Sequence, residues 1–182
     1  MTGDLPHVFV ASAVWDLPWR AKRQRAAPGL WGAVIRDWTL TGVLTRQSGA
    51  PLAIGQTTNN NAFAGFGTER PHLVGDPALP ADQRSVSRWF NTSAFAAAPA
   101  FAIGTSPRNP VRGPAYRNLD LALVRRVPLR GSSVLELRAE AFNATSTPPL
   151  GAPNTTVGSA AFGTITTAGD PWVVQLAVKF AF

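Results

Sequence analysis

Several kinds of residue and segment are scarce or missing in this 182-residue chain. It has no cysteine, which excludes disulfides, thiolate catalysis and cysteine-based zinc or iron sites. Charged residues make up 15%, well below the usual quarter. No apolar run approaches the eighteen or more residues that a membrane-crossing helix needs, so a helical membrane protein is excluded.

Signals for targeting and catalysis are also missing. The start, Met1 to Pro6, has neither a basic segment nor an apolar core, so no signal peptide is predicted. The chain has no Gly-x-Ser-x-Gly elbow, phosphate-binding loop or dinucleotide fingerprint. His7 and His72 lie far apart and lack carboxylates at metal-site spacing. We therefore expect no catalytic residue, no metal site and no cofactor, and the chain is not predicted to be an enzyme.

The charge balance is basic, with a formal net charge of +7. Such a balance is compatible with nucleic-acid binding. However, the arginines are scattered and the aromatic residues are not interleaved with them. A basic soluble nucleic-acid binder is thus the weakest of three alternatives, and no nucleic-acid partner is expected. The tight basic cluster at 20–25 is expected to be solvated or near anionic lipid headgroups.

The last eleven residues, 172–182, alternate between large apolar side chains and small, polar or mixed ones. The large apolar set is Trp172, Val174, Leu176, Val178, Phe180 and Phe182. A period of two is typical of a β-strand with two different faces. About ten such residues, tilted, cross a bilayer, and an aromatic residue at each end fits the two interfaces.

The same alternation predicts five strands in all. They are expected over about 7–17, 38–47, 118–127, 133–143 and 171–182. Residues 128–132 are predicted to form a tight turn, whereas 48–117 and 144–170 are long connections. A structureless loop of this length in a compact domain is usually functional or disordered. The apolar islands in 48–117 indicate an ordered, self-packed loop.

Motifs in a fixed order carry a family resemblance. They lie at 6–12 with 16–18, 38–49, 70–77, 89–95, 112–114 with 118–120, 138–143, and 162–163 through 168–171. Together they resemble the C-terminal part of a TonB-dependent outer-membrane receptor, of the type with an N-terminal carboxypeptidase-regulatory-like domain. The terminal strand resembles the closing strand of bacterial outer-membrane β-barrels, in which the assembly machinery recognises the C-terminal aromatics. Phe180 and Phe182 are the residues that match this assembly signal.

The resemblance implies an all-β fold: an antiparallel meander of about five transmembrane strands, forming an incomplete, curved part of a large barrel. With Phe182 on the periplasmic side, both long connections, 48–117 and 144–170, are extracellular. Receptors of this kind close about 22 strands around a plug. This chain has five strands, no plug and no TonB-contacting box, so we expect a C-terminal fragment or a gene model begun at an internal Met1, not active alone.

The function implied is energy-coupled uptake across the bacterial outer membrane. Loops capture the ligand, and the plug then moves under force from the inner membrane. Expected partners are outer-membrane lipid, the barrel assembly machinery, and the plug and barrel strands absent from this chain; TonB is expected to engage only the missing N-terminal part. The alternative is a passive outer-membrane barrel or a secreted all-β surface-binding module.

The two faces of the strands are assigned from this barrel expectation. The lipid-facing set is Leu119, Leu121, Leu123, Leu135, Leu137, Val174, Leu176 and Val178. The lumen-facing set is Asp120, Arg126, Glu136, Arg138, Glu140, Gln175 and Lys179. The charged residues either line a lumen that contacts plug or substrate, or form cross-strand pairs each contributing well under ~1 kcal/mol, and both can hold together.

Three aromatic residues in the long connection, Trp89, Phe90 and Phe95, are candidates for contact with a ligand. Aromatic islands in loops more often anchor the loop, and anchoring is the favoured interpretation here. The sequence does not identify a substrate.

Overall fold

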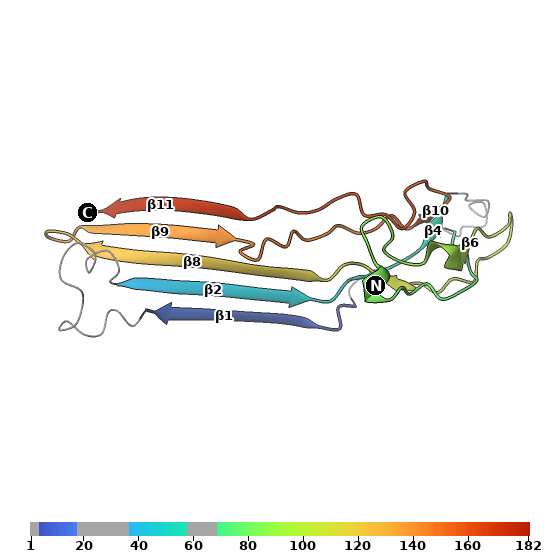
Figure 1. Cartoon of the computed structure of the whole chain (residues 1–182), viewed down its shortest axis with the longest axis horizontal. Coiled ribbons are helices and arrows are strands. Elements are labelled where there is room, and N and C mark those ends of the chain that lie inside the picture. The colour runs from blue at the N-terminus through green and yellow to red at the C-terminus, as the bar shows by residue number, and fades with distance from the viewer. Residues whose placement is uncertain (1–3, 18–36, 58–68) are drawn as a thin grey trace. The chain divides into compact units, whose positions relative to one another are not determined.

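A computed structural model describes residues 4–17, 37–57 and 69–182 (Figure 1). The chain divides into two compact units, which we treat separately. The sheet unit consists of Val8–Arg46, Arg117–Pro148 and Asp170–Phe182. The loop unit consists of Met1–His7, Gln47–Tyr116 and Pro149–Gly169. The basic cluster predicted to be solvated, at 20–25, lies outside the described residues.

The sheet unit is one five-stranded sheet in the order β1-β2-β8-β9-β11. Its strands are β1 (Val8–Asp16), β2 (Trp38–Gln47), β8 (Tyr116–Pro128), β9 (Val134–Phe142) and β11 (Val173–Ala181). They follow one another as an antiparallel meander, which confirms the predicted fold class. The strand ends lie within two residues of the predicted ones, because period-two alternation is a local signal.

A tight turn joins β8 to β9, as the sequence predicts for 128–132. Pro128 is the last residue of β8, and proline has no N–H to continue a ladder. The Leu129 N–H donates to the Ser133 carbonyl at 2.8 Å. Gly131 has φ +73°, a left-handed conformation that glycine adopts without steric cost.

Close approach and side-chain hydrogen bonds hold β2 between its neighbours. A Cβ at Gly42 would lie 3.2 Å from Leu121 Cδ2, so the missing side chain lets Leu121 of β8 cover the strand. Thr41 Oγ1 donates to the Ala122 carbonyl at 3.2 Å. On the other side, Thr39 Oγ1 donates to Asp16 Oδ1 of β1 at 2.7 Å.

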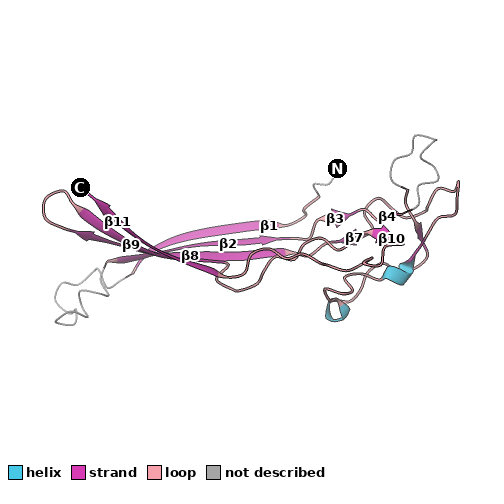
Figure 2. Cartoon of the chain, turned by 90° about the horizontal axis from the view of Figure 1, so that it is seen from above, coloured by secondary structure: helices cyan, strands magenta, loops and turns pink. Residues whose placement is uncertain are grey.

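The described residues of the loop unit form short ladders and two single-turn 3₁₀-helices, η3 (Ala81–Gln83) and η4 (Thr92–Ala94) (Figure 2). The antiparallel pairs are β3 (Pro51–Leu52) with β7 (Val111–Arg112), and β5 (His72–Leu73) with β6 (Phe95–Ala96). β4 (Gly55–Gln56) pairs in parallel with β10 (Thr156–Val157). No helix in the described part of the chain is long and apolar enough to cross a membrane.

The β4–β10 pair joins the two long connections. The sequence predicts 48–117 and 144–170 as long connections, with self-packing expected for the first, and makes no prediction of contact between them. In the structure the second connection supplies β10 and packs with the first as one unit. A two-residue strand has too few side chains to show alternation, so this pairing has no local signal.

Aromatic side chains form the centre of the loop unit. The buried core consists of Ile54, Phe90, Ala94, Phe95 and Val111. Phe162, from the second connection, packs against it with ring centroids 5.2 Å from Phe90 and 5.9 Å from Phe95, both edge to face. Edge-to-face pairs of this kind contribute about 0.5–1.5 kcal/mol beyond area burial.

Buried and half-buried polar groups in the loop unit find partners. Gln56 Nε2 donates to Glu69 Oε2 at 2.6 Å, and Gln56 Oε1 accepts from the Ala98 N–H at 2.8 Å. Arg112 Nη2 pairs with Asp4 Oδ2 at 2.6 Å, and its Nη1 donates to the carbonyls of Asp4 and Gly49. These bonds join segments of the loop unit that are distant in sequence.

We predict that Phe90→Ala destabilises the loop unit by about 3–5 kcal/mol, the usual cost of emptying a buried phenylalanine site. Hydrogen-exchange protection of the amides in β3, β6 and β7 measures the loss. Ile103→Ala is the control, since Ile103 is 65% exposed, and it should change protection little. Equal effects of the two variants would contradict the core described above.

Candidate functional site

One face of the sheet gathers the polar and charged side chains of β8, β9 and β11. Three cross-strand rows carry them: Arg126–Glu136–Lys179, Val124–Arg138–Ala177 and Ala122–Glu140–Gln175. By strand alternation Asp120 shares this face. We call this surface the polar face. All seven residues predicted to face a lumen lie on it, although a lumen itself remains a prediction.

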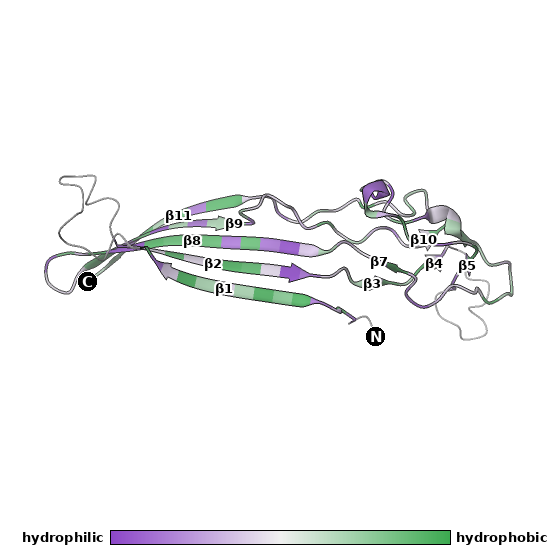
Figure 3. Cartoon of the chain, turned by 60° about the horizontal axis from the view of Figure 1, so that its bottom comes forward, coloured by the Kyte–Doolittle hydropathy of each residue, from purple (hydrophilic) through white to green (hydrophobic). Residues whose placement is uncertain are grey.

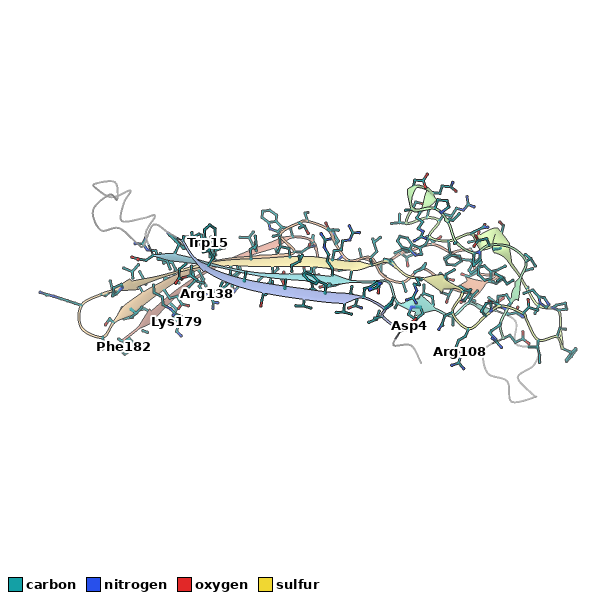
Figure 4. The ribbon with its side chains drawn as sticks, turned by 90° about the horizontal axis from the view of Figure 1, so that it is seen from below. Asp4, Trp15, Arg108, Arg138, Lys179 and Phe182 are labelled. Atoms are coloured by element: carbon teal, nitrogen blue, oxygen red, sulfur yellow. The ribbon has the colours of Figure 1, made fainter. Side chains whose placement is uncertain are left out.

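Opposite charges alternate across the polar face. Arg126 Nε lies 2.8 Å from Glu136 Oε2, and Arg138 Nη2 lies 3.3 Å from Glu140 Oε1. Arg138 Nε lies 4.0 Å from the second oxygen of Glu136. Arg138 and Lys179 come from neighbouring strands towards the end of the sheet where Phe182 lies (Figure 4). Water screens such partly exposed pairs, so their main effect is to neutralise the face.

Asp120 has a structural role that sequence reasoning missed. Its Oδ1 accepts the backbone N–H of Asn143 at 3.0 Å, and its Oδ2 accepts from Asn118 Nδ2 at 2.8 Å. Asn143 is a non-glycine residue with φ +50°, a conformation that costs energy unless its surroundings hold it. The carboxylate of Asp120 therefore fixes the point at which the chain leaves β9.

A hollow of about 630 Å³ opens on the polar face. It is lined by Thr39 and Thr41 of β2, Val124 and Arg126 of β8, and Arg138 of β9, with Asp16, Asp37, Trp38 and Pro128 completing the lining. The polar face is therefore the hollowed side of the sheet in this region. A polar, hollowed inner side is what the wall of a water-filled barrel presents.

The opposite surface, the apolar face, carries large hydrophobic side chains in register. Leu123 pairs across Ala139 with Leu176, and Leu137 pairs with Val178. Leu176 and Val178 are 77% and 71% exposed. Figure 3 shows the resulting bands of hydrophobic and hydrophilic residues along β8. All eight residues predicted to face lipid lie on this face by alternation, and their contact with lipid remains a prediction.

Arg125 is a charged residue on the apolar face, which by alternation also carries Arg46 near the end of β2 and Arg117 near the start of β8. Its guanidinium lies 5.9 Å from the centre of the Trp38 ring, a cation–π distance. Arg125 is close to the end of β8 and so close to the edge of any hydrocarbon band. Long basic side chains at such positions place the charge in the interface.

The two outer strands leave the described sheet with open edges. β1 and β11 each have a single neighbour in the sheet order. β1 is hydrophobic over most of its length (Figure 3), with Phe9 and Trp15 each 57% exposed. Beyond β11, Phe182 is 94% exposed, and its ring centroid lies 5.8 Å from that of Phe180. Recognition of this aromatic pair by the assembly machinery remains a prediction.

The three aromatic residues considered for ligand contact separate into two groups. Phe90 and Phe95 are 2% and 7% exposed and form the core of the loop unit, so they anchor the loop and cannot reach a ligand. Trp89 is half-buried, and its Nε1 donates to the Arg112 carbonyl at 2.8 Å. It lines a hollow of about 320 Å³ together with Arg84 and Arg112, two residues that no sequence pattern linked to it.

Within the described ranges, no group of three or more His, Asp or Glu residues is placed to hold a metal ion. Glu136 and Glu140 share the polar face, with Arg138 in contact with both. This arrangement neutralises the two carboxylates, whereas acid–base chemistry requires groups held ready to exchange a proton.

Comparison with known proteins gives one family. The family model described as "Outer membrane beta barrel domain" matches residues 1–175. No curated protein and no solved structure matches the chain.

Substitutions at neighbouring residues of β8 distinguish the two faces. We predict that Leu123→Arg lowers the stability of the membrane-inserted sheet by about 2–4 kcal/mol, because its side chain would enter hydrocarbon. Ala122→Arg is the matched control, since Ala122 lies on the polar face in register with Glu140, and it should be nearly neutral. Urea titration of the native polypeptide carrying each substitution, in lipid vesicles, measures both. Equal destabilisation by the two variants would refute the assignment of the faces.

Proposed function

The chain belongs to the outer membrane β-barrel domain family, and we propose that it forms part of the wall and surface loops of a TonB-dependent receptor. Membership of this family makes it a protein of the bacterial outer membrane. Within the family, the proposed role is energy-coupled uptake of a substrate. The proposed receptor is of the type that carries an N-terminal carboxypeptidase-regulatory-like domain.

The observation that carries the proposal is the difference between the two ends of the sheet, where its strands begin and finish. The two longest connections, from β2 to β8 and from β9 to β11, leave from the same end and build one folded unit. At the other end, the turn at 129–133 joins β8 to β9 and residues 17–37 join β1 to β2, so the two longest connections share one end and the shortest lies at the other. Outer-membrane barrels have short periplasmic turns and longer extracellular loops. A folded extracellular unit with its own core suits ligand capture better than it suits a passive pore.

The open edges of β1 and β11 support a larger barrel. In hydrocarbon every backbone N–H and C=O must be hydrogen-bonded, so a sheet in a membrane cannot have an edge strand with unpaired backbone groups. The smallest barrels need about eight strands, and plugged transporters have about 22. We therefore propose that further strands pair with β1 and β11, and that a plug faces the polar face.

Each surface of the chain then has a role. The apolar face contacts outer-membrane lipid, and the polar face contacts the plug and the solvated substrate path. The strand β11 with Phe180 and Phe182 is the signal read by the barrel assembly machinery. TonB acts on the plug side of the receptor, and this chain supplies wall and loops without catalytic chemistry.

The outer membrane of the source bacterium offers the test. An antibody against residues 77–88 should detect a polypeptide several times larger than the 19.3 kDa of this chain. Mass spectrometry of that band should find peptides of a plug and a TonB-contacting box, and the purified C-terminal domain of TonB should retain it. A 19.3 kDa membrane species without a plug would indicate a passive barrel. The same species in the culture medium would indicate a secreted surface-binding module, and either result would overturn the receptor proposal.

A further inference from the structure

A surface hollow in the loop unit has the features of a small-molecule site. Its volume is about 320 Å³, at the lower end of the range of about 300–1,000 Å³ typical of ligand pockets. Apolar lining comes from Pro110, Val111 and Leu79, and polar lining from Arg84, Arg112 and Asn109. Polar and apolar groups share the lining about equally, so the hollow offers both hydrogen-bonding groups that orient a small organic ligand and apolar surface for its body.

Arg84 is held in place at this hollow with part of its guanidinium uncommitted. Its Nε donates to the Leu79 carbonyl at 2.8 Å, and its Cζ lies 5.9 Å from the centre of the Trp89 ring. Trp89 is itself fixed by its bond to the Arg112 carbonyl. Among the described residues, the two terminal nitrogens of Arg84 have no hydrogen-bond acceptor or acidic partner. The guanidinium fork is thus oriented in advance, which reduces the entropy lost on binding.

The charge around the hollow selects the kind of ligand. Arg112, the other cation, already pairs with Asp4 at 2.6 Å, and no acidic residue is in the lining. A divalent cation therefore has no carboxylate to bind. One uncompensated guanidinium matches a single negative charge, and its planar fork matches a carboxylate, which it binds through two parallel hydrogen bonds. The Asn109 amide, without a hydrogen-bond partner in the described structure, adds a neutral donor and acceptor.

We propose that this hollow binds a small organic carboxylate, with the carboxylate on Arg84 and the apolar body against Pro110 and Val111. The inference deepens the proposed function, because it names the substrate class that the extracellular unit of the receptor would capture. The Trp89 ring orients Arg84 and is not itself required to stack on the ligand. Binding is expected to be weak in this chain alone, since the hollow is shallow and one charge-assisted contact dominates.

The test uses the full chain folded in detergent micelles, with benzoate as the probe. Saturation-transfer NMR titrations give dissociation constants for benzoate and for benzamide, its neutral counterpart of nearly the same shape. Benzoate should bind at least tenfold more tightly than benzamide, because charge-assisted hydrogen bonds are the stronger ones. Arg84→Gln should weaken benzoate binding about tenfold and leave benzamide binding nearly unchanged.

A matched control lies four residues away. Arg88→Gln removes the same charge from the same segment, but Arg88 does not line the hollow, so benzoate binding should stay within twofold of the original. A second variant, Ala78→Phe, places a bulky side chain in the lining and should abolish binding while Arg84 is retained. Near-ultraviolet circular dichroism confirms that each variant keeps the packed core. If Arg84→Gln does not fold, Ala78→Phe with the benzamide comparison decides.

Three outcomes would overturn the inference: no benzoate binding by the folded chain, equal binding of benzoate and benzamide, or equal losses in Arg84→Gln and Arg88→Gln. None of these outcomes bears on the receptor proposal, which depends on the size of the native polypeptide and on the presence of a plug in it. Conversely, selective benzoate binding by a chain that proves to be a passive barrel would uphold the site and refute its role in energy-coupled uptake.

Discussion

The structure depends on one constraint: a sheet that crosses a bilayer must pair its backbone internally while presenting different side chains to its two sides. The antiparallel ladder between β9 and β11, from Val173↔Phe142 to Ala181↔Val134, satisfies the backbone. The period of two then separates the apolar row that contains Leu137 and Val178 from the polar row that contains Glu136 and Lys179. A shift of one residue would exchange the two faces, so the side-chain pattern also fixes the register.

Outside the sheet, long segments rich in glycine and proline fold without long strand ladders. An aromatic core around Phe90 holds the loop unit together, with hydrogen bonds and an ion pair between segments distant in sequence. Gln56 and Glu69 satisfy each other in the interior, and Arg112 joins Asp4 to the segment at Gly49. Such ordering gives the loop unit fixed surfaces, and fixed surfaces are what the ligand capture proposed for it requires.

Whether the sequence could predict a feature depends on how far apart in the chain the residues that form it lie. The five strands, the turn at 128–132 and the composition of the two faces depend on alternation between near neighbours, so they were predictable. The pairing of Gly55 with Thr156 and the contact of Phe162 with Phe90 were not, because each joins segments separated by β8 and β9. The sequence favoured an anchoring role for the aromatic residues of the long connection, and Phe90 and Phe95 do lie in the core of the loop unit. The hollow at Arg84 depends on the path of 77–112 around that core, and neither composition nor spacing encodes that path.

The most direct test of the central claim is a spin-label scan of β8 in the native polypeptide, inserted in lipid vesicles with the strands that pair with β1 and β11. This chain has no cysteine, so after replacement of any cysteine elsewhere in the polypeptide, single cysteines at positions 121, 122, 123 and 124 can be labelled without background. Accessibility to oxygen should be high at 121 and 123 and low at 122 and 124, and accessibility to a polar nickel chelate should follow the reverse pattern. Accessibilities that do not alternate along the strand, or that alternate in the opposite phase, would contradict the assignment of one face to lipid and the other to a lumen.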